Sequence, residues 1–449
     1  MIGMPRNPST VLVGLAAIAA VAFAYANVQA QESQITDGEA LDPEQMQRRI
    51  DELQQRVEDL ESTAVLSEPE TRVRRITVWV DENGIEHDTA VPGSREVVTY
   101  QRERVYRRQT INEKIEEALD DAARRSVGVG VDAAITFQNA QQTGGPDSIA
   151  DGNNYQLASA DLFFTAGLAQ YTVFFADIVG LSGTPPDAEV GGLTLLNGYT
   201  ARLVEQNQLN LREAWLMTEV FKQRLSLTAG RVDLTNYFDH NAAANDETTQ
   251  FLSDALVNNP MLGLSENGAG MAAVYDPKTG FSAKLGYQQS TSEATNLSDS
   301  LFYLAELGYL WTPFNLGEGN YRAWYRTDNS SGVDRKAYGV SIDQRVSPVV
   351  TLFARYGSAQ SEATRDHFYS AGFTLAKGVV FNPEDAWGIG YSNVELGAGD
   401  EEVLVEGYYN LRMTQKLALS FHLTHVTEEP LATGKVSYYV PGVRFQASF

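Results

Sequence analysis

The residues able to carry out acid–base, nucleophilic or metal chemistry do not occur at the spacings that such chemistry requires. The chain has five histidines and no cysteine, and no pair of histidines has the separation of a zinc motif. His422 and His425 are three residues apart and would face opposite sides of a strand. No nucleophile elbow, phosphate-binding loop or dinucleotide fingerprint occurs. We therefore predict that the protein is not an enzyme and uses no metal and no cofactor.

Arginines and aromatic residues alternate with other residues along several segments, which places them on one face of a strand. A flat aromatic ring stacks on the C–H face of a sugar, and arginine or glutamate bonds its hydroxyl groups. Side chains of this kind tune the selectivity of a channel lumen without tight binding. An alternative is a solvated lumen whose charges pair with one another and recognise nothing. The candidate lining residues are Arg322, Trp324, Arg326, Phe353, Arg355, Glu406, Tyr408, Arg412 and Arg444.

In the segments that carry these residues, apolar and polar side chains alternate with a period of two residues. From Val127 onward, apolar and small or polar residues alternate in runs about as long as the ~9–11 residues of a tilted membrane strand. Short turns alternate with long polar loops. The sequence predicts an all-β fold over 127–449, a transmembrane antiparallel β-barrel of about 16 strands. A secreted β-sandwich or β-helix is the alternative. The strands are expected to start near residues 127, 155, 170, 209, 223, 269, 281, 301, 319, 335, 348, 367, 385, 402, 415 and 436.

The pattern at the end of the chain supports the prediction of a barrel. Val443, Phe445, Ala447 and Phe449 alternate with polar or small residues, and Phe449 ends the chain. A terminal aromatic residue on an alternating strand resembles the signal recognised by the bacterial barrel-insertion machinery. We therefore predict that this machinery is a partner and that the protein lies in the outer membrane of a Gram-negative bacterium.

The first 70 residues contain two predicted elements. Residues 1–30 read as a signal peptide, with Arg6 before an apolar stretch and Val28-Gln29-Ala30 as the cleavage site. Residues 31–70 form a linker and a short helix whose apolar residues from Met46 to Leu60 follow a heptad pattern. The pattern favours a coiled coil and a homo-oligomer. The alternative is one amphipathic helix that lies on another surface.

Residues 71–126 are expected to form a small periplasmic module without catalytic spacing. Ile76, Val78 and Val80 share one face of a strand, and Asn83-Gly84 supplies a tight-turn pair for a hairpin. A capping box at 110–113 starts a helix. With the helix before it, the module leaves open a structural role, in which the protein binds peptidoglycan or another partner.

The formal charge of −24 argues against nucleic acid as a partner, because such binding requires a basic face. Many of the acidic residues lie in expected outer loops, where they would face membrane lipid and lipopolysaccharide.

The loop at residues 232–268 gives the strongest indication of function. It contains Phe238, Phe251, Leu252 and Leu256, which would not remain exposed, so we expect it to fold into the lumen and narrow it. A loop packed over the barrel mouth is the alternative. We expect Arg231, Asp233 and Asp239 beside Arg322, Arg326 and Arg355, with opposite charges facing each other across a water-filled pore.

The run from Leu211-Arg212-Glu213-Ala214-Trp215 through Gly230-Arg231 and Asn236-Tyr237-Phe238-Asp239 to Asn267-Gly268-Ala269-Gly270 resembles the carbohydrate-selective (OprB-type) porin family. The resemblance covers roughly 127–449. It implies a sixteen-stranded barrel whose inward loops narrow a lumen lined by arginines and aromatic residues. It also implies passive diffusion of small polar solutes, carbohydrates first among them. The N-terminal extension departs from the family's barrel, and a siderophore or organic-acid porin, or a tether to the cell wall, stays open.

Overall fold

The computed structural model describes most of the chain from residue 127 onward and parts of the segment before it. The described residues are 71–80, 86–87, 92, 95–104, 115, 118–119 and 127–448, with gaps at 170, 203, 265, 290–299, 330–334, 362–363, 379–381, 383, 415 and 432–433. The predicted signal peptide, the Met46–Leu60 helix, the capping box and Phe449 lie outside these residues. Those predictions therefore stay predictions.

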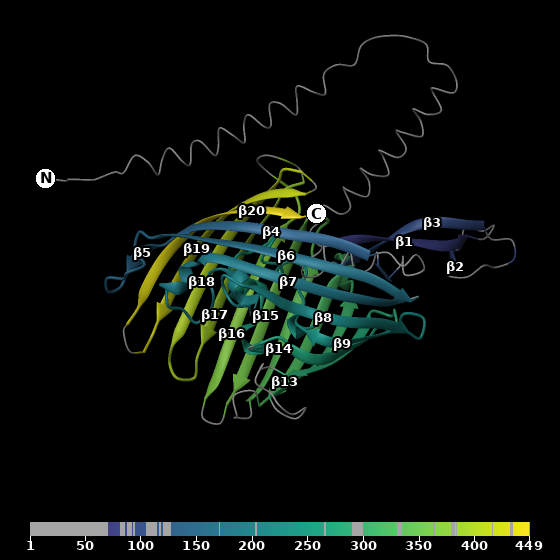
Figure 1. Ribbon diagram of the computed structural model, residues 1–449. Helices are drawn as coiled ribbons and strands as arrows, with labels where there is room; N and C mark the ends of the chain where they lie inside the picture. The colour runs from purple at the N-terminus through teal and green to yellow at the C-terminus, as the bar shows by residue number, and fades with distance from the viewer. Residues whose placement is uncertain are drawn as a thin grey trace, which may run out of the picture. The chain divides into compact units, whose positions relative to one another are not determined.

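Residues 127–448 form one closed antiparallel barrel of sixteen strands, in which β5 continues the course of β4 (Figure 1). Closure leaves no open sheet edge, so the backbone groups along every strand have a neighbouring strand to pair with. The strands are β4 (Val127–Asn139), β5 (Gln141–Gly144), β6 (Asn154–Ala169), β7 (Thr172–Thr184), β8 (Leu209–Val220), β9 (Leu225–Val232), β10 (Gly268–Tyr275), β11 (Phe281–Gln289), β12 (Leu301–Trp311), β13 (Gly319–Asp328), β14 (Arg335–Arg345), β15 (Val350–Gln360), β16 (Arg365–Leu375), β17 (Ala386–Glu395), β18 (Glu401–Arg412), β19 (Leu417–Glu429) and β20 (Val436–Ser448).

The last strand closes the ring against the first. β20 pairs with β4 from Gly442 opposite Gln138 to Ser448 opposite Asp132. Each strand pairs with its sequence neighbours, so the connections alternate between the two ends of the barrel. Short turns such as 221–224 and 276–280 lie at one end, and the long segments 185–208 and 233–267 start from the other. The predicted barrel, its strand number and the alternation of turn lengths are confirmed.

The two faces of the barrel wall differ as the period of two requires. On β13, Arg322, Trp324 and Arg326 are buried, whereas Tyr325 between them is 48% exposed. Leu352 of β15 is likewise exposed, whereas Phe353 beside it is buried. Polar and charged side chains therefore point inward, and apolar side chains cover the outside. Aromatic residues are frequent on the outer face and include Tyr287, Tyr303, Tyr309, Trp311, Tyr325, Tyr338, Tyr369 and Tyr391.

A three-stranded sheet precedes the barrel. β1 (Thr71–Val80) pairs with β3 (Arg95–Arg104) on one edge and with β2 (Glu86–His87) on the other. The expected pairing of the first strand with a later one is present, with Val78 opposite Val97. Further along, Ala118 and Leu119 are helical and buried, and they belong to one hydrophobic cluster with the inward-facing Phe163 and Trp215.

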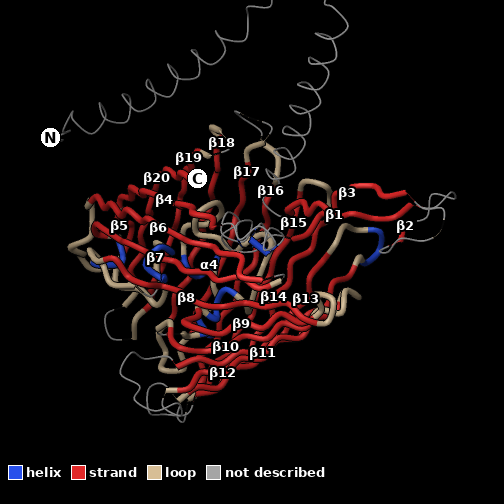
Figure 2. Tube along the Cα trace, turned by 45° about the vertical axis from the view of Figure 1, so that its right-hand side comes forward, coloured by secondary structure: helices blue, strands red, loops and turns tan. Residues whose placement is uncertain are grey.

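Helices in the described barrel region are short. None of the described helices has the length and apolarity of a membrane span. Five of the described helices lie between β7 and β10, inside the ring of strands that Figure 2 shows in red. The helices are η2 (Pro186–Ala188), η3 (Gly198–Arg202), η4 (Leu234–Asn236), α4 (Asp254–Val257), η5 (Pro260–Leu262) and η6 (Pro313–Asn315).

Candidate functional site

The segment between β9 and β10, residues 233–267 and here called the long loop, lies inside the barrel. Phe238, Phe251, Leu256 and most of the residues between them are buried. The long loop contacts inward-facing residues of strands from β11 around to β20, which lie on different sides of the lumen. The described part of the long loop therefore crosses the lumen, as the sequence predicted.

Wall cations hold the long loop by its backbone carbonyl groups. Arg355 donates to the carbonyl oxygens of Leu256 at 2.9 Å and Asp239 at 3.1 Å. Such charge-assisted bonds are about twice as strong as neutral ones. The other bonds of this kind run from Lys284 to Tyr237 at 2.6 Å, from Arg322 to His240 at 2.8 Å, from Arg326 to Met261 at 3.0 Å and from Arg444 to Glu247 at 2.5 Å and Gln250 at 3.2 Å.

Wall carboxylates hold the same loop by its N–H groups. Glu406 of β18 accepts from the amides of Leu252 at 2.7 Å and Ser253 at 2.8 Å. Glu306 of β12 accepts from the amide of Asp239 at 2.7 Å. A loop without strand partners has backbone groups that must be satisfied once it is buried. Charged side chains of the wall satisfy them here.

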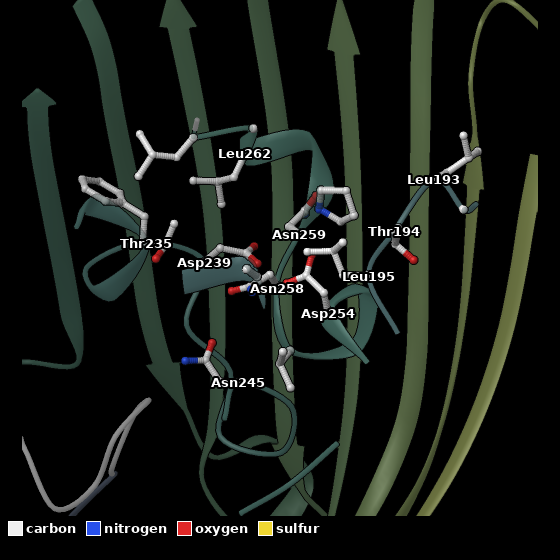
Figure 3. Close-up of a pocket in the computed structure, with 17 residues that line it drawn as sticks. Leu193, Thr194, Leu195, Thr235, Asp239, Asn245, Asp254, Asn258, Asn259 and Leu262 are labelled. Atoms are coloured by element: carbon white, nitrogen blue, oxygen red, sulfur yellow. Dashed lines mark hydrogen bonds between the residues drawn. The ribbon is translucent and has the colours of Figure 1, made fainter. Parts of the chain in front are cut away.

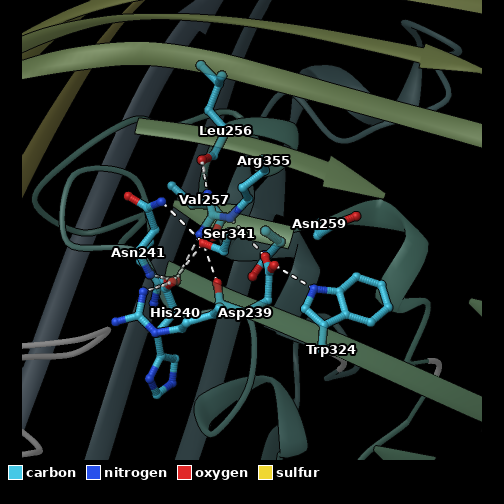
Figure 4. Close-up of polar contacts among 12 residues, drawn as sticks. Asp239, His240, Asn241, Leu256, Val257, Asn259, Trp324, Ser341 and Arg355 are labelled. Atoms are coloured by element: carbon cyan, nitrogen blue, oxygen red, sulfur yellow. Dashed lines mark hydrogen bonds and ion pairs between the residues drawn. The ribbon is translucent and has the colours of Figure 1, made fainter. Parts of the chain in front are cut away.

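Asp239 and Arg355 form the centre of this arrangement (Figure 4). Arg355 Nε lies 2.8 Å from Asp239 Oδ2, and Trp324 Nε1 donates to Asp239 Oδ1 at 2.7 Å. Asp239 has a left-handed backbone with φ of 56°. Burial raises the pKa of Asp239 to about 6, although Arg355 and the indole N–H oppose that shift.

Aromatic residues of the wall are covered by the long loop. Phe251 packs edge-on against Phe353 at 5.7 Å and Tyr408 at 4.8 Å between ring centres. Phe353 and Tyr408 are only 3% and 5% exposed. These rings therefore do not offer open faces on which a sugar could stack.

Two wall glycines allow the long loop to lie this close. A Cβ atom on Gly357 of β15 would lie 2.4 Å from Asn259 Oδ1, and one on Gly390 of β17 would lie 2.8 Å from Leu256 Cδ2. Larger residues at these positions would displace the loop.

A second segment, residues 185–208 and here called the short loop, also folds inward. Glu402 of β18 accepts from the amides of Leu193 at 2.7 Å and Thr194 at 3.2 Å. Arg202 is 1% exposed and pairs with Asp161 of β6 at 2.6 Å and with Glu247 of the long loop at 3.0 Å. Among the long polar loops that the sequence predicts, this one was not expected to turn inward. Its leucines and Tyr199 were the signal that it would be buried.

The two loops form one layer. The Gly198 amide donates to the Leu252 carbonyl at 2.6 Å, and the Asp254 amide donates to the Leu195 carbonyl at 2.8 Å. A cavity of about 310 Å³ lies between the loops (Figure 3). It is lined by Leu193, Thr194 and Leu195 of the short loop and by Thr235, Asp239, Asn245, Asp254, Asn258 and Asn259 of the long loop, among others.

The structure brings together most of the residues that the sequence selected. Asp239, Arg322, Trp324, Arg326, Phe353, Arg355, Glu406, Tyr408 and Arg444 all contact the long loop or belong to it. Asp233 is buried at the base of the loop and pairs with Arg212 at 2.6 Å.

Two of the selected residues lie elsewhere. Arg231 is on the face opposite the buried Val232, and its Nε donates to the Leu211 carbonyl at 2.8 Å. It therefore does not face the lumen. Arg412 faces inward near the short-turn end and is half-buried, and its amide donates to Asp385 at 2.9 Å.

The expected environment of the arginines was wrong. We expected them to border water and to face carboxylates across a pore. Arg322, Arg326 and Arg355 are instead 3–5% exposed, and Asp239 contacts Arg355 directly. The long loop covers these arginines, because its buried carbonyl groups need the donors that they supply.

Comparisons with known proteins agree with this fold. No protein-family model matches the sequence. An uncharacterized protein of Aquifex aeolicus is 26% identical over 217 residues, which are 48% of this chain and 63% of that protein. Porin AaxA of Chlamydia trachomatis is 28% identical over 207 residues, 41% of this chain and 44% of that protein. The chain thus spans less than two thirds of the length of these relatives.

A solved structure of Pseudomonas putida OprB at high pH superposes with a TM-score of 0.59. The match has 14% identity and covers 76% of this chain and 97% of that one. The likeness is one of fold.

Proposed function

We propose that this protein is an outer-membrane porin through which small polar solutes diffuse passively. The observation that carries the proposal is a closed barrel, apolar and aromatic outside and polar inside, whose lumen is narrowed by two loops. An apolar outer band with aromatic residues suits a bilayer, and a polar interior suits water and solutes. The similarity to Porin AaxA and the fold shared with OprB support the same function.

Carbohydrates are the solutes that we propose first. The resemblance of the sequence to carbohydrate-selective (OprB-type) porins supports them, and so does the cavity between the loops. Thr194, Asn245 and Asn258 provide hydroxyl and carboxamide groups, which both donate and accept hydrogen bonds as sugar hydroxyls do. Recognition in this cavity would rest on hydrogen bonds and not on stacking, because Trp324, Phe353 and Tyr408 are buried.

Planar-bilayer recordings of the purified, folded protein test the proposal. We expect stable conductance steps that a neutral sugar reduces, together with swelling of sugar-loaded liposomes. A variant without residues 242–258 should conduct more and discriminate less among solutes, because the middle of the long loop occupies the lumen. Folded protein that gives neither conductance in planar bilayers nor swelling of liposomes would refute the porin function.

A further inference from the structure

The two loops that narrow the lumen carry almost only negative charge. The short loop contains Asp187, Glu189 and Glu205, and the long loop contains Asp233, Asp239, Asp246, Glu247, Asp254 and Glu266. Arg202 is the single lysine or arginine in the two loops. It lies between the carboxylates of Asp161 and Glu247. The loops are therefore acidic, although Arg212, Arg355 and Arg202 pair with three of these carboxylates, those of Asp233, Asp239 and Glu247.

The positive charges of the wall that contact the long loop do not line the cavity between the two loops. Lys284, Arg322, Arg326, Arg355 and Arg444 each bind a carbonyl group of the long loop. The first four also lie within 4 Å of a carboxylate. All five are at most 9% exposed. Their positive charge is therefore offset by groups that they contact directly.

The cavity between the loops reflects this division of charge. No described residue that lines it is lysine, arginine or histidine, whereas Asp254 contributes a carboxylate and Asp239 contributes one that is paired with Arg355. Asp254 is half-buried and accepts from Asn258 Nδ2 at 2.5 Å. Leu195, Phe238 and Leu262 supply an apolar part of the wall. Such a surface complements a small molecule that carries a positive charge on a partly apolar body.

A pair of acidic side chains lies behind Gly192, another lining residue. Glu402 and Glu428 stand directly opposite each other on β18 and β19, where like charges repel. A Cβ atom on Gly192 would lie 2.6 Å from Oε2 of Glu402 and 3.0 Å from Oε1 of Glu428. Among the residues that the structure describes, Glu428 Oε1 is buried without a hydrogen-bond partner, and the residue is 7% exposed.

We propose that the constriction prefers cations, so that protonated amines and neutral polar solutes pass and anions are largely excluded. The proposal rests on the porin function and adds the charge class of the solute. Carboxylates in a narrow space with low-dielectric walls raise the local concentration of cations and lower that of anions. A cation near Gly192 would also offset the repulsion between Glu402 and Glu428.

A second cavity of about 350 Å³ tests the consistency of this assignment. It shares Leu193, Pro260 and Gly263 with the first and is lined by Arg326, Arg335 and Asp366. Arg326 pairs with Asp328. Arg335 is exposed at the loop end of β14. Selectivity is set where the passage is narrowest, so we assign it to the loops and not to Arg335.

Reversal potentials in a potassium chloride gradient across a planar bilayer test the proposal on the full-length protein. We expect a reversal potential of the sign that preference for potassium over chloride gives. Near pH 8.5, where both carboxyl groups are ionised, Asp254→Asn and Glu428→Gln should each lower the potassium-to-chloride permeability ratio by about twofold or more, because each removes one charge close to the passage. Asp147→Asn is the matched control. It removes an exposed carboxylate from an outer loop and should leave the ratio unchanged.

Liposome swelling extends the test to solutes, with protonated ethanolamine and glycolate as a pair of similar size and opposite charge. Faster entry of ethanolamine supports the proposal. A conducting channel with anion preference or no preference overturns it and leaves the porin function intact. Equal shifts in Asp254→Asn, Glu428→Gln and Asp147→Asn overturn the assignment of selectivity to the constriction. Folded protein without conductance refutes the porin function and this proposal with it.

Discussion

At the scale of single residues, the charged groups of the inner wall act as anchors for the loops. Arg355 alone makes contacts with Asp239, Asn245 and Leu256, at three places along the long loop. Removing one partner of a buried ion pair costs about 3–5 kcal/mol, because the other charge is left uncompensated. The anchors are therefore expected to control how firmly the loop narrows the lumen.

Arg355→Ala should release part of the long loop. Asp239 would lose its cation and Leu256 its donor, so we expect a larger and noisier single-channel conductance. Arg231→Ala is the control, because Arg231 lies on the other face of the wall and bonds only the Leu211 carbonyl among the contacts described. Planar-bilayer recordings give the comparison. Equal conductance in the two variants would show that Arg355 does not hold the loop.

Asp187 should make the channel sensitive to pH. Burial raises its pKa from 3.8 to about 7, although the Leu196 and Asn197 amides donate to it at 2.5 and 3.2 Å. The folded state thus favours the protonated form. That stabilisation is present below pH 3.8 and is lost as the pH rises to about 7. Above that pH the carboxylate adds negative charge to the short loop.

Cation preference should therefore be greater near pH 8.5 than near pH 5.5, and Asp187→Asn should reduce the difference. Glu205→Gln removes an exposed carboxylate from the same loop and should retain the pH response of the unmodified protein. Reversal potentials at both pH values provide the measurement. An unchanged response in Asp187→Asn would assign the titration to another group.

At the scale of elements, β18 holds both loops. Glu402 binds two amides of the short loop, and Glu406, four residues later, binds two amides of the long loop. Glu406 also contacts His422 Nδ1 at 2.8 Å. The spacing of four keeps both carboxylates on the inner face. One strand therefore determines where the two loops meet.

Glutamine at these positions should loosen one loop at a time. A glutamine side chain has one accepting oxygen and presents N–H groups where two backbone donors need acceptors, which costs about 1–3 kcal/mol. Limited proteolysis with identification of the fragments should show new cleavage within 233–267 for Glu406→Gln and within 185–208 for Glu402→Gln. Each variant is the control for the other. Cleavage of both loops in both variants would indicate general unfolding instead.

At the scale of the whole molecule, the barrel from residue 127 to 448 contains every residue assigned to the passage. The proposed roles of the N-terminal extension in self-association and in binding peptidoglycan are separate from conduction. The heptad pattern from Met46 to Leu60 is the basis for them, and two to three heptads are marginal without a partner.

Deletion of residues 31–70 should leave single-channel conductance unchanged. It should alter the oligomer size in detergent or the retention of the protein on peptidoglycan, since the apolar seam would be lost. Light scattering and a cell-wall pull-down provide the measurements. Altered conductance with unchanged assembly would assign the extension to the passage.

The sequence by itself determined the barrel, because alternation between two faces is a local property of each strand. All sixteen strands start within two residues of the place that the alternating pattern predicted, among them β8 at Leu209, β13 at Gly319 and β20 at Val436. The inward face of Arg322, Arg355 and Arg444 was predicted in the same way. The burial of the long loop was also predictable, since its phenylalanines and leucines require a covered position.

Only the tertiary structure decided what the inward charges do. Arg444 binds the Glu247 carbonyl across 197 residues of sequence, and no local pattern records such a contact. The inward course of the short loop depends equally on Glu402 and Asp161, which lie on distant strands. The arginines looked like the lining of an open pore because their partners are backbone carbonyl groups, and every residue has one. Their burial leaves the loop carboxylates to set the charge of the passage.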